Sequence, residues 1–364
     1  MLMRIDFYLA DQNPHRDKSR GITEYTHGLL KELSALEDLD ITCIVSRSSY
    51  RPSNPKIKLK ELPLNTGGTL QRVAADHLHP WLSRRKTDLR HYPKGFAPIF
   101  ARWSMPLVGT VHDTILDFYA SQYPSSRTRI AFRYWSEQLK RSLQRFDLVL
   151  TVSEFSRRCI LEFCDRKGIR PPNVHVTYEG ARWESDVGKS GAKDDYVLHL
   201  CSALPHKRTD TLLDHWDLLE KGRAFVPRLL LLGRLTEGQL NRVTQLRNVT
   251  HVPPEGDHSF KSRIQAALAL ILPSEIEGFG LPALESYYLG TPVVYVRQTA
   301  VEEVLGPDTP GGFHVSSYAS FIAALEEVLT LDRSWIVTKA KSLREQFAWA
   351  KCAARTFNAY RSVL

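Results

Sequence analysis

Residues 273–290 read PSEIEGFGLPALESYYLG and lie between two apolar runs of strand length, 268–272 and 292–296. The Gly-Phe-Gly segment at 278–280 allows a tight loop and a close approach of the backbone to a ligand. Pro282 suits the first residue of a helix, where its missing N–H does no harm. The stretch therefore predicts a strand, a loop, a helix that starts at Pro282 and a second strand, which is a repeating unit of parallel α/β sheets.

Two glutamates flank this predicted loop. Glu277 precedes the glycines and Glu285 is expected in the first helical turn, so both carboxylates can face one ligand. An ionised carboxylate accepts two hydroxyl donors at once, which suits a sugar or a ribose. The amides at the helix start would stabilise a diphosphate at the same place.

The same alternation of strand and helix patterns runs through the whole chain, and it builds parallel sheets that are covered on both faces. A helix is predicted at 22–36. Further strands are predicted at 5–9, 41–45, 107–111, 148–152, 174–178, 196–200, 228–232 and 249–252.

This alternation of strands and helices predicts two doubly wound, Rossmann-like α/β domains that face a central cleft. Ligands are expected at the carboxyl ends of the strands. The linker is expected in the polar stretch 184–195, which has few apolar residues. We expect a first domain at 1–183, that linker, a second domain at 196–340 and a C-terminal helix at 341–364. One arrangement open to this helix is packing against the first domain.

Length and composition fit two globular domains. The 364 residues exceed one ordinary core, and the contents of 43% hydrophobic and 24% charged residues are near globular averages. The first residues lack the features of an export signal, and no apolar run approaches the length that spans a bilayer. Five cysteines, an odd number in a chain of this size, indicate reduced thiols. We therefore expect a cytoplasmic protein.

The net charge of +9 arises in the first half of the chain. Residues 1–180 hold 28 Lys and Arg against 19 Asp and Glu, whereas residues 181–364 hold 21 of each. We expect an anionic partner for the first half, such as nucleic acid, an anionic membrane surface or a phosphorylated substrate. In the stretch 71–90, Trp81 and other apolar residues are mixed with basic ones, which fits membrane contact and equally fits a solvated helix and loop.

The loop, its two glutamates and the flanking strands together resemble the Glu-x7-Glu motif of retaining glycosyltransferases of the GT-B fold, in the large family that includes bacterial mannosyltransferases. The resemblance covers essentially the whole chain. It implies that the first domain, 1–183, binds the acceptor and that the second domain, 196–340, binds the nucleotide sugar. It implies that Glu277 acts in catalysis by holding the hydroxyls of the donor sugar and that Glu285 holds the nucleotide ribose. The other donor-binding residues that it implies on this loop are Gly278, Phe279, Gly280 and Leu281.

Other segments resemble characteristic parts of the same family. The basic loop His206, Lys207 and Arg208 is similar to the clamp that holds the donor diphosphate, with Lys207 as a catalytic residue. His112, in a His-Asp segment at a strand end, is implied to border the transferred sugar. Gly21 resembles a glycine near the donor phosphates. Secondary candidates are Asp113, Gly233 and Ser153, the last of which also fits a helix N-cap.

Two positions depart from the family pattern. Cys201 stands where many relatives have Gly, and Tyr-Glu-Gly at 178–180 stands where many have Pro-Asn-Gly. These departures leave the local loop geometry open, but not the fold.

The resemblance implies that a hexose is transferred with retention of configuration from a nucleotide diphosphate sugar to a saccharide or lipid-linked saccharide. The pattern favours GDP-mannose as donor, and bacterial surface polysaccharide such as lipopolysaccharide as product. Rhamnose, glucose and N-acetylated sugars stay open as alternative donor sugars. Basic groups and the helix start would stabilise the departing diphosphate. No cofactor is expected. Asp38-Leu39-Asp40 matches the letters of a metal clamp, but it falls in a turn away from the expected cleft edge, so metal independence is predicted.

Three other protein classes share features with this chain, and the epimerase is the closest rival. An oxidoreductase would need G-x-G-x-x-G after the first strand, and the sequence lacks it there. A non-hydrolysing sugar-nucleotide epimerase shares the two-domain architecture and also grips a nucleotide diphosphate. A basic nucleic-acid-binding protein is disfavoured because aromatic residues are not interleaved with basic ones in a binding motif, so no nucleic-acid partner is expected.

Overall fold

The computed structural model describes residues 2–13, 20–82, 86–99, 104–123, 129–188, 191–222 and 226–364. The chain forms two compact units. The first unit comprises Met1–Gly180 with Phe347–Leu364, and the second comprises Ala181–Gln346. In the described part of the chain, no helix is both long enough and apolar enough to cross a membrane.

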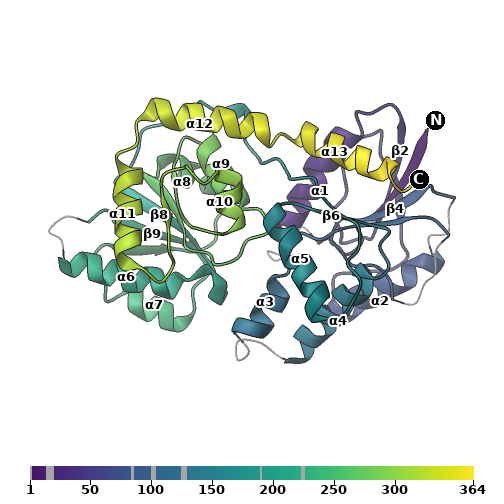
Figure 1. Ribbon diagram of the computed structural model, residues 1–364, viewed down its shortest axis with the longest axis horizontal. Helices are drawn as coiled ribbons and strands as arrows, with labels where there is room; N and C mark the ends of the chain where they lie inside the picture. The colour runs from purple at the N-terminus through teal and green to yellow at the C-terminus, as the bar shows by residue number, and fades with distance from the viewer. Residues whose placement is uncertain are drawn as a thin grey trace. The chain divides into compact units, whose positions relative to one another are not determined.

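The first unit is a parallel sheet with helices packed against it (Figure 1). Its strands, in spatial order, are β3 (Lys58–Glu61), β2 (Leu39–Val45), β1 (Met3–Tyr8), β4 (Leu89–Tyr92), β5 (Leu107–Thr110), β6 (Leu148–Thr151) and β7 (Val174–Val176). Its helices are α1 (Arg20–Leu33), α2 (Thr69–Leu82), α3 (Ile115–Gln122), α4 (Arg129–Leu143), α5 (Glu154–Arg166) and α13 (Trp349–Arg361).

The second unit repeats this plan. Its strands, in spatial order, are β10 (Val249–Val252), β9 (Arg228–Gly233), β8 (Tyr196–Cys201), β11 (Ala269–Leu272), β12 (Val293–Val296) and β13 (Gly312–Phe313). Its helices are η2 (Glu184–Asp186), η3 (Pro205–Lys207), α6 (Thr209–Gly222), α7 (Glu237–Val243), α8 (Asp257–Ala266), α9 (Leu281–Tyr288), α10 (Ala300–Leu305), α11 (Tyr318–Leu329) and α12 (Arg333–Gln346).

Both sheets are doubly wound, and each has one point where the chain reverses its direction of growth. In the first unit the chain runs from β1 to the β3 edge and then returns to place β4 on the other side of β1. In the second unit β8 and β11 are related in the same way. Ligands bind in α/β sheets at the carboxyl ends of such neighbouring strands, because the loops that follow them diverge there.

Buried apolar strands explain why the sheets form. β6, β11 and β12 are buried along their whole length, as parallel strands covered on both faces require. Strand β4 was not predicted because its sequence, LRHY, reads as polar. Its charged residue has a partner in the interior, because Arg90, which is fully buried, donates to Asp6 at 2.8 Å. The short strands β3 and β13 were also not predicted.

The C-terminal segment forms two helices where the sequence suggested one. α12 belongs to the second unit, and the chain then passes through Phe347 into α13, which packs beside α1 in the first unit (Figure 1). Trp349 explains this contact, because its ring lies where Gly28 of α1 and Gly180 carry no side chain. The predicted helix at 22–36 ends earlier, at Leu33.

The stretch predicted as a linker, 184–195, lies within the second unit. It begins with the short helix η2. Near its end, Lys193 donates to the Gln265 carbonyl at 2.9 Å and to the Thr291 hydroxyl at 2.6 Å. The polar composition of this stretch predicted a linker between the domains, but these hydrogen bonds attach it to the rest of the second unit.

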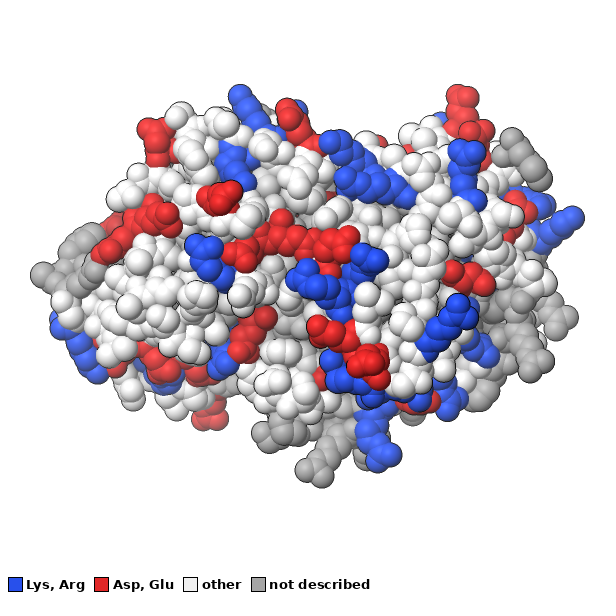
Figure 2. Space-filling model, in the orientation of Figure 1, with Lys and Arg blue, Asp and Glu red and all other residues white. Residues whose placement is uncertain are grey.

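Charged side chains of both signs are mixed on the surface. On the face shown in Figure 2, Lys and Arg lie among Asp and Glu. The positive excess of the first half of the sequence therefore does not form one continuous basic surface on this face.

Candidate functional site

Lys207 and Glu277 meet at the reversal point of the second sheet. Lys207 ends η3, which follows β8, and Glu277 lies in the loop after the neighbouring strand β11. Lys207 Nζ lies 2.5 Å from Glu277 Oε1, and the two side chains are only 20% and 15% exposed. The sequence predicted both residues as parts of one site, and the structure brings them into direct contact.

The charges around Glu277 keep it ionised. Burial by itself raises the pKa of Glu277, but Lys207 and His206 outweigh this effect, so the pKa lies below its ordinary value. At neutral pH the site therefore presents a carboxylate beside an ammonium group. Such a pair can accept hydroxyl hydrogens at one atom and stabilise anionic oxygens at the other.

The rest of the basic loop is joined to the loop after β11. Arg208 adopts a left-handed backbone conformation with φ 49° and forms an ion pair with Glu275. The Glu275 amide donates to the His206 carbonyl at 3.0 Å. His206 is 3% exposed, so its role is to anchor the loop more than to offer a surface.

The glycine loop turns the chain into α9. Gly280 has φ 98°, and a Cβ on it would lie 2.9 Å from Val301 Cγ2, so glycine is needed there for its backbone conformation and for space. The helix starts at Leu281, not at Pro282 as predicted, and Pro282 is its second residue. Gly278 lies in the loop, and Phe279 beside it is buried.

The sequence predicted Glu285 in the first turn of the helix, but it lies beyond that turn, as the fifth residue of α9, and is 3% exposed. Arg182 holds it with two hydrogen bonds, Nε to Oε1 at 2.7 Å and Nη2 to Oε2 at 3.1 Å. The guanidinium also lies 4.4 Å from the ring centroid of Trp183. Sequence reasoning missed Arg182, because 103 residues separate it from its partner. A carboxylate has further lone pairs, so Glu285 can still accept ribose hydroxyls.

Gly233 has a structural explanation. It pairs with Cys201 between β8 and β9, and a Cβ on it would lie 2.1 Å from the Cys201 carbonyl oxygen. The tight backbone approach at the end of β8 is thus made possible by the glycine on the adjacent strand, β9. This close packing accounts for Gly233 without a ligand.

His112 lies in the first unit, directly after β5. Its Nε2 donates to the Pro93 carbonyl at 2.9 Å, and its ring stands edge-on to Tyr25, with centroids 4.7 Å apart. Burial lowers the pKa of His112 to about 4, although the bond to Pro93 opposes the shift. The ring is therefore neutral at pH 7, and its second nitrogen, Nδ1, is a hydrogen-bond acceptor.

A buried hydrogen-bond chain underlies this part of the first unit. Tyr25 bonds Thr110 at 3.2 Å, Thr110 bonds His91 at 2.7 Å, and His91 bonds Tyr360 of α13 at 2.7 Å. Tyr25 contacts His112, so the chain connects the C-terminal helix to the surroundings of a candidate site residue. The sequence offered no signal for this chain.

Two of the remaining candidates of the first unit, Asp113 and Ser153, form local hydrogen bonds. Asp113 Oδ1 accepts from the Ile115 amide at 3.0 Å at the start of α3. Ser153 is the N-cap of α5, as predicted, and accepts from the Ser156 amide at 2.9 Å. Gly21 is the second residue of α1, and nothing lies within 4 Å of a Cβ built on it.

The Asp-x-Asp sequence lies away from these residues. Asp40 is near the amino end of β2 and forms an ion pair with Lys58 of β3 at 2.7 Å. Among the described residues, no three side chains of His, Cys, Asp or Glu are grouped as a metal site requires.

The sequence matches two protein families, one in each half of the chain. Residues 184–347 match the family Glycosyl transferases group 1, and residues 19–182 match Glycosyltransferase Family 4. The chain is 27% identical to O-antigen chain mannosyltransferase B of Escherichia coli, over 94% of this chain and 96% of that protein. It is also 27% identical to the MMP alpha-(1->4)-mannosyltransferase of Mycolicibacterium hassiacum, over 72% of this chain and 67% of that protein.

Solved structures share the fold. The sucrose-phosphate synthase of Thermosynechococcus elongatus superposes with a TM-score of 0.69 at 17% identity, covering 99% of this chain and 98% of the other. HepE of Anabaena, in complex with UDP and glucose, gives a TM-score of 0.65 at 17% identity, covering 99% and 100%. Two Rossmann-like units, their matched families and the mannosyltransferase relatives lead to one conclusion: the chain belongs to the group 1 glycosyltransferases of the GT-B fold and is similar to bacterial mannosyltransferases.

Proposed function

We propose that the protein transfers mannose, with retention of configuration, from GDP-mannose to a saccharide or lipid-linked saccharide during the cytoplasmic assembly of a bacterial surface polysaccharide. The observation that carries the proposal is the Lys207–Glu277 pair at the reversal point of the second sheet. The relatives in Escherichia coli and Mycolicibacterium hassiacum support the choice of sugar, since both are named as mannosyltransferases.

The proposed mechanism is mainly electrostatic. The nucleotide diphosphate leaves with increasing negative charge, and a preorganised cation beside it lowers that barrier. Lys207 is held in place by Glu277 before the donor binds. Arg208 and the start of α9 are the other positive groups of this region. In this proposal Glu277 orients the donor sugar, Glu285 binds the ribose, and these cations meet the diphosphate charge without a metal ion.

His112 is assigned to sugar binding and not to proton transfer. A histidine whose pKa is about 4 is a weak base at neutral pH. Its accepting nitrogen can receive a sugar hydroxyl, while the bond to Pro93 fixes the ring. No general base is assigned.

An anionic membrane surface is the proposed location of a lipid-linked acceptor. Helix α2 carries exposed apolar side chains, with Leu78 47%, Trp81 48% and Leu82 42% exposed. Two basic residues of the predicted membrane stretch, Arg84 and Arg85, lie outside the described residues. The exposed apolar face supports the proposal through its amphipathic pattern.

The experiment is a donor panel. The purified protein is incubated with GDP-mannose, UDP-glucose, UDP-N-acetylglucosamine or dTDP-rhamnose, with and without methyl α-D-mannoside as a saccharide acceptor, in EDTA and separately in Mn²⁺. The acceptor-dependent release of the nucleotide diphosphate is followed. GDP-mannose should be the preferred donor, with equal rates in both buffers. Glu277→Gln should reduce turnover by at least about 100-fold, since it removes a charge that the transition state uses.

The matched control is Glu237→Gln, because Glu237 is exposed at the start of α7. This control should keep wild-type turnover. Equal turnover in Glu277→Gln and wild type would overturn the proposal. Conversion of the sugar nucleotide without any acceptor would indicate the epimerase instead, and an inverted anomeric configuration in the product would contradict retention.

A further inference from the structure

The buried hydrogen-bond chain of the first unit starts on the C-terminal helix. It runs from Tyr360 of α13 through His91 of β4 and Thr110 of β5 to Tyr25 of α1. All of these side chains are fully buried. The sequence implied none of them as site residues. The hydrogen-bond chain joins two helices and two strands, so it is complete only when α13 is packed beside α1.

The protonation state of each member of this hydrogen-bond chain follows from its burial. Burial raises the pKa of Tyr360 and the pKa of Tyr25 well above the ordinary value, so both phenols keep their hydrogens. Burial and the neighbouring His112 lower the pKa of His91 to about 3, so its ring is neutral at pH 7. A neutral imidazole has one N–H donor and one acceptor nitrogen. One nitrogen of His91 must therefore donate and the other must accept.

The Tyr360 hydroxyl decides which nitrogen of His91 carries the hydrogen. Among the residues that the structure describes, His91 Nδ1 is the one hydrogen-bond partner of this hydroxyl, and it lies 2.7 Å away. If Nδ1 donated to the phenol oxygen, the phenol hydrogen would be buried without an acceptor, which is unfavourable. Tyr360 therefore donates to Nδ1, and the hydrogen of the His91 ring lies on Nε2.

This choice sets the direction of every later hydrogen bond. His91 Nε2 donates to Thr110 Oγ1 at 2.7 Å, so the hydroxyl of Thr110 donates in turn to the Tyr25 oxygen, 3.2 Å away. Tyr25 also bonds the side chain of Thr177, which donates to the Thr151 carbonyl at 3.4 Å. The hydrogen-bond chain thus ends on a backbone carbonyl, which only accepts. In this direction each hydroxyl hydrogen has an acceptor.

The hydrogen-bond chain supports the ring of His112 from two sides. On one side, the ring of Tyr25 stands edge-on to His112, with centroids 4.7 Å apart and an interplanar angle of 88°. The ring of Trp349, also on α13, lies 6.1 Å from that of Tyr25. On the other side, His112 Nε2 donates to the carbonyl of Pro93, which is two residues after His91. A displacement of Tyr25 or His91 would therefore move the ring of His112.

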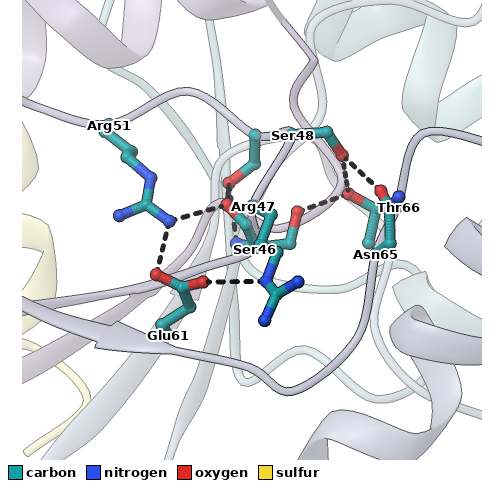
Figure 3. A network of polar contacts seen from close by, with 8 residues as sticks. Ser46, Arg47, Ser48, Arg51, Glu61, Asn65 and Thr66 are labelled. Carbon is teal, nitrogen blue, oxygen red and sulfur yellow. Dashed lines mark hydrogen bonds and ion pairs between the residues drawn. The ribbon is translucent and has the colours of Figure 1, made fainter.

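A second histidine–tyrosine bond holds α1 and offers a matched comparison. His27 Nδ1 and the Tyr50 hydroxyl are 2.9 Å apart. The loop that carries Tyr50 is braced by a polar network of its own, in which Arg51 donates to Glu61 (Figure 3). In the part of the protein that is described, neither His27 nor Tyr50 forms a hydrogen bond or ring contact with His112. Loss of this phenol hydroxyl should therefore affect α1 without affecting His112.

We propose that Tyr360 of the C-terminal helix is a positioning residue for the ring of His112. Through the hydrogen-bond chain it fixes the ring of His91 and holds the ring of Tyr25 against which His112 stands. This inference rests on the proposed function, in which His112 receives a hydroxyl of the transferred sugar. Tyr360 is buried and acts through His112, so loss of its hydroxyl should lower sugar transfer only while His112 is present.

The first measurement observes the histidine rings directly, in the full-length protein labelled with ¹⁵N-histidine. Two-bond ¹H–¹⁵N NMR spectra distinguish a ring nitrogen that carries hydrogen from one that accepts. The signals are assigned by their loss in His91→Gln and His112→Gln. Wild-type His91 should carry its hydrogen on Nε2. Tyr360→Phe should shift the Nδ1 signal of His91, which loses its donor, and also the ring signals of His112. Tyr50→Phe should leave both sets of signals unchanged.

The second measurement is a double-mutant cycle on kcat/KM, with GDP-mannose as donor and methyl α-D-mannoside as acceptor. Tyr360→Phe should lower kcat/KM by about three- to tenfold in wild type, and by less than about twofold in the His112→Ala background. Thr110→Val interrupts the hydrogen-bond chain after His91 and should cause the same loss, so it serves as the second variant if Tyr360→Phe does not fold. Tyr50→Phe should keep wild-type kcat/KM. The Kd of GDP, which lacks the sugar, should stay unchanged in all variants.

Three results would overturn the proposal: a wild-type His91 with its hydrogen on Nδ1, His112 signals that do not change in Tyr360→Phe, or an equal loss of kcat/KM with and without His112. An equal loss in Tyr50→Phe would also overturn it, because general loosening of α1 would then be the cause. If wild type transfers no sugar from any donor while the NMR results are as expected, the proposed function fails, and the support of His112 by Tyr360 holds.

Discussion

Arg182 and Glu285 form a two-point ion pair within the second unit, with N···O distances of 2.7 and 3.1 Å. The Glu285 side chain is 5% exposed and that of Arg182 is 21% exposed. The carboxylate that the Glu-x7-Glu motif assigns to ribose binding is therefore already oriented by a residue outside the motif. This relationship makes Arg182 a positioning residue.

Arg182→Ala should destabilise the second unit by about 2–4 kcal/mol, because the buried Glu285 charge loses its partner. The measurement is urea unfolding followed by intrinsic fluorescence. Adding Glu285→Gln to Arg182→Ala should restore part of this loss, since the unpaired charge is then removed. If Arg182→Ala unfolds at the wild-type urea concentration, the pair does not hold Glu285.

Lys207→Met should weaken binding of GDP by about 10- to 100-fold, the effect of losing one charge-assisted contact to phosphate. Isothermal titration calorimetry checks this value. Lys221→Met is the matched control, because Lys221 is 69% exposed and pairs with Asp217 on the surface of α6. Equal GDP affinity in Lys207→Met and wild type would contradict the role of Lys207 as a phosphate clamp.

Gly28→Ala should destabilise the first unit by about 1–3 kcal/mol through overpacking. A Cβ at this position would lie 2.3 Å from Trp349 Cε2, and the ring is wedged between Gly28 and Gly180. Gly21→Ala, on the same helix, should be neutral or stabilising by up to about 1 kcal/mol, since nothing lies within 4 Å of its Cβ. Thermal unfolding compares the two. A similar loss in both variants would show helix propensity, not Trp349, to be the cause.

His199→Gln should make the protein less sensitive to mild acid. Burial lowers the pKa of His199 to about 4, while an unfolded histidine titrates near 6.5. The unfolded state therefore binds more protons between these values, and the free energy of unfolding falls as the pH falls from about 6.5 towards 4. Between pH 7 and 5.5 one such histidine accounts for about 1 kcal/mol.

Urea unfolding at pH 7 and 5.5 measures this difference. Wild type should lose more stability than His199→Gln over this interval, whatever the absolute stability of the variant at pH 7. An unchanged difference between the two pH values would mean that His199 is protonated in the folded protein.

Much of the fold could be predicted from apolar runs. β6, β11 and β12 were predicted to within a residue at each end, because buried parallel strands are nearly uniform in hydropathy. Strand β4 could not, because its polar residues are buried with partners from other parts of the chain. Local sequence does not show whether a charged side chain will find such a partner.

The candidate site was predicted from short sequence motifs, that is, from residue types at characteristic spacings. Glu277, Lys207 and the glycine loop could be recognised in this way, because each motif and the backbone conformation that it needs lie within one short segment. The N-cap at Ser153 was also confirmed for this reason: its hydrogen bond spans three residues. The exact start of α9 differed by one residue, because Gly280 and Val301 together decide where the turn ends.

By itself, then, the sequence determined two parallel α/β units, the order of their strands along the chain and the segments that carry the family motif. Hydrophobic periodicity, glycines and capping residues act over a few positions, so they can be read locally. Only the tertiary structure decided that Arg182 binds Glu285, that Trp349 fills the space beside Gly28, and that His91 bonds Tyr360 of α13. Those relationships depend on which side chains, distant in sequence, are buried together. Burial determines both the free energy of each interaction and the pKa values of the groups involved.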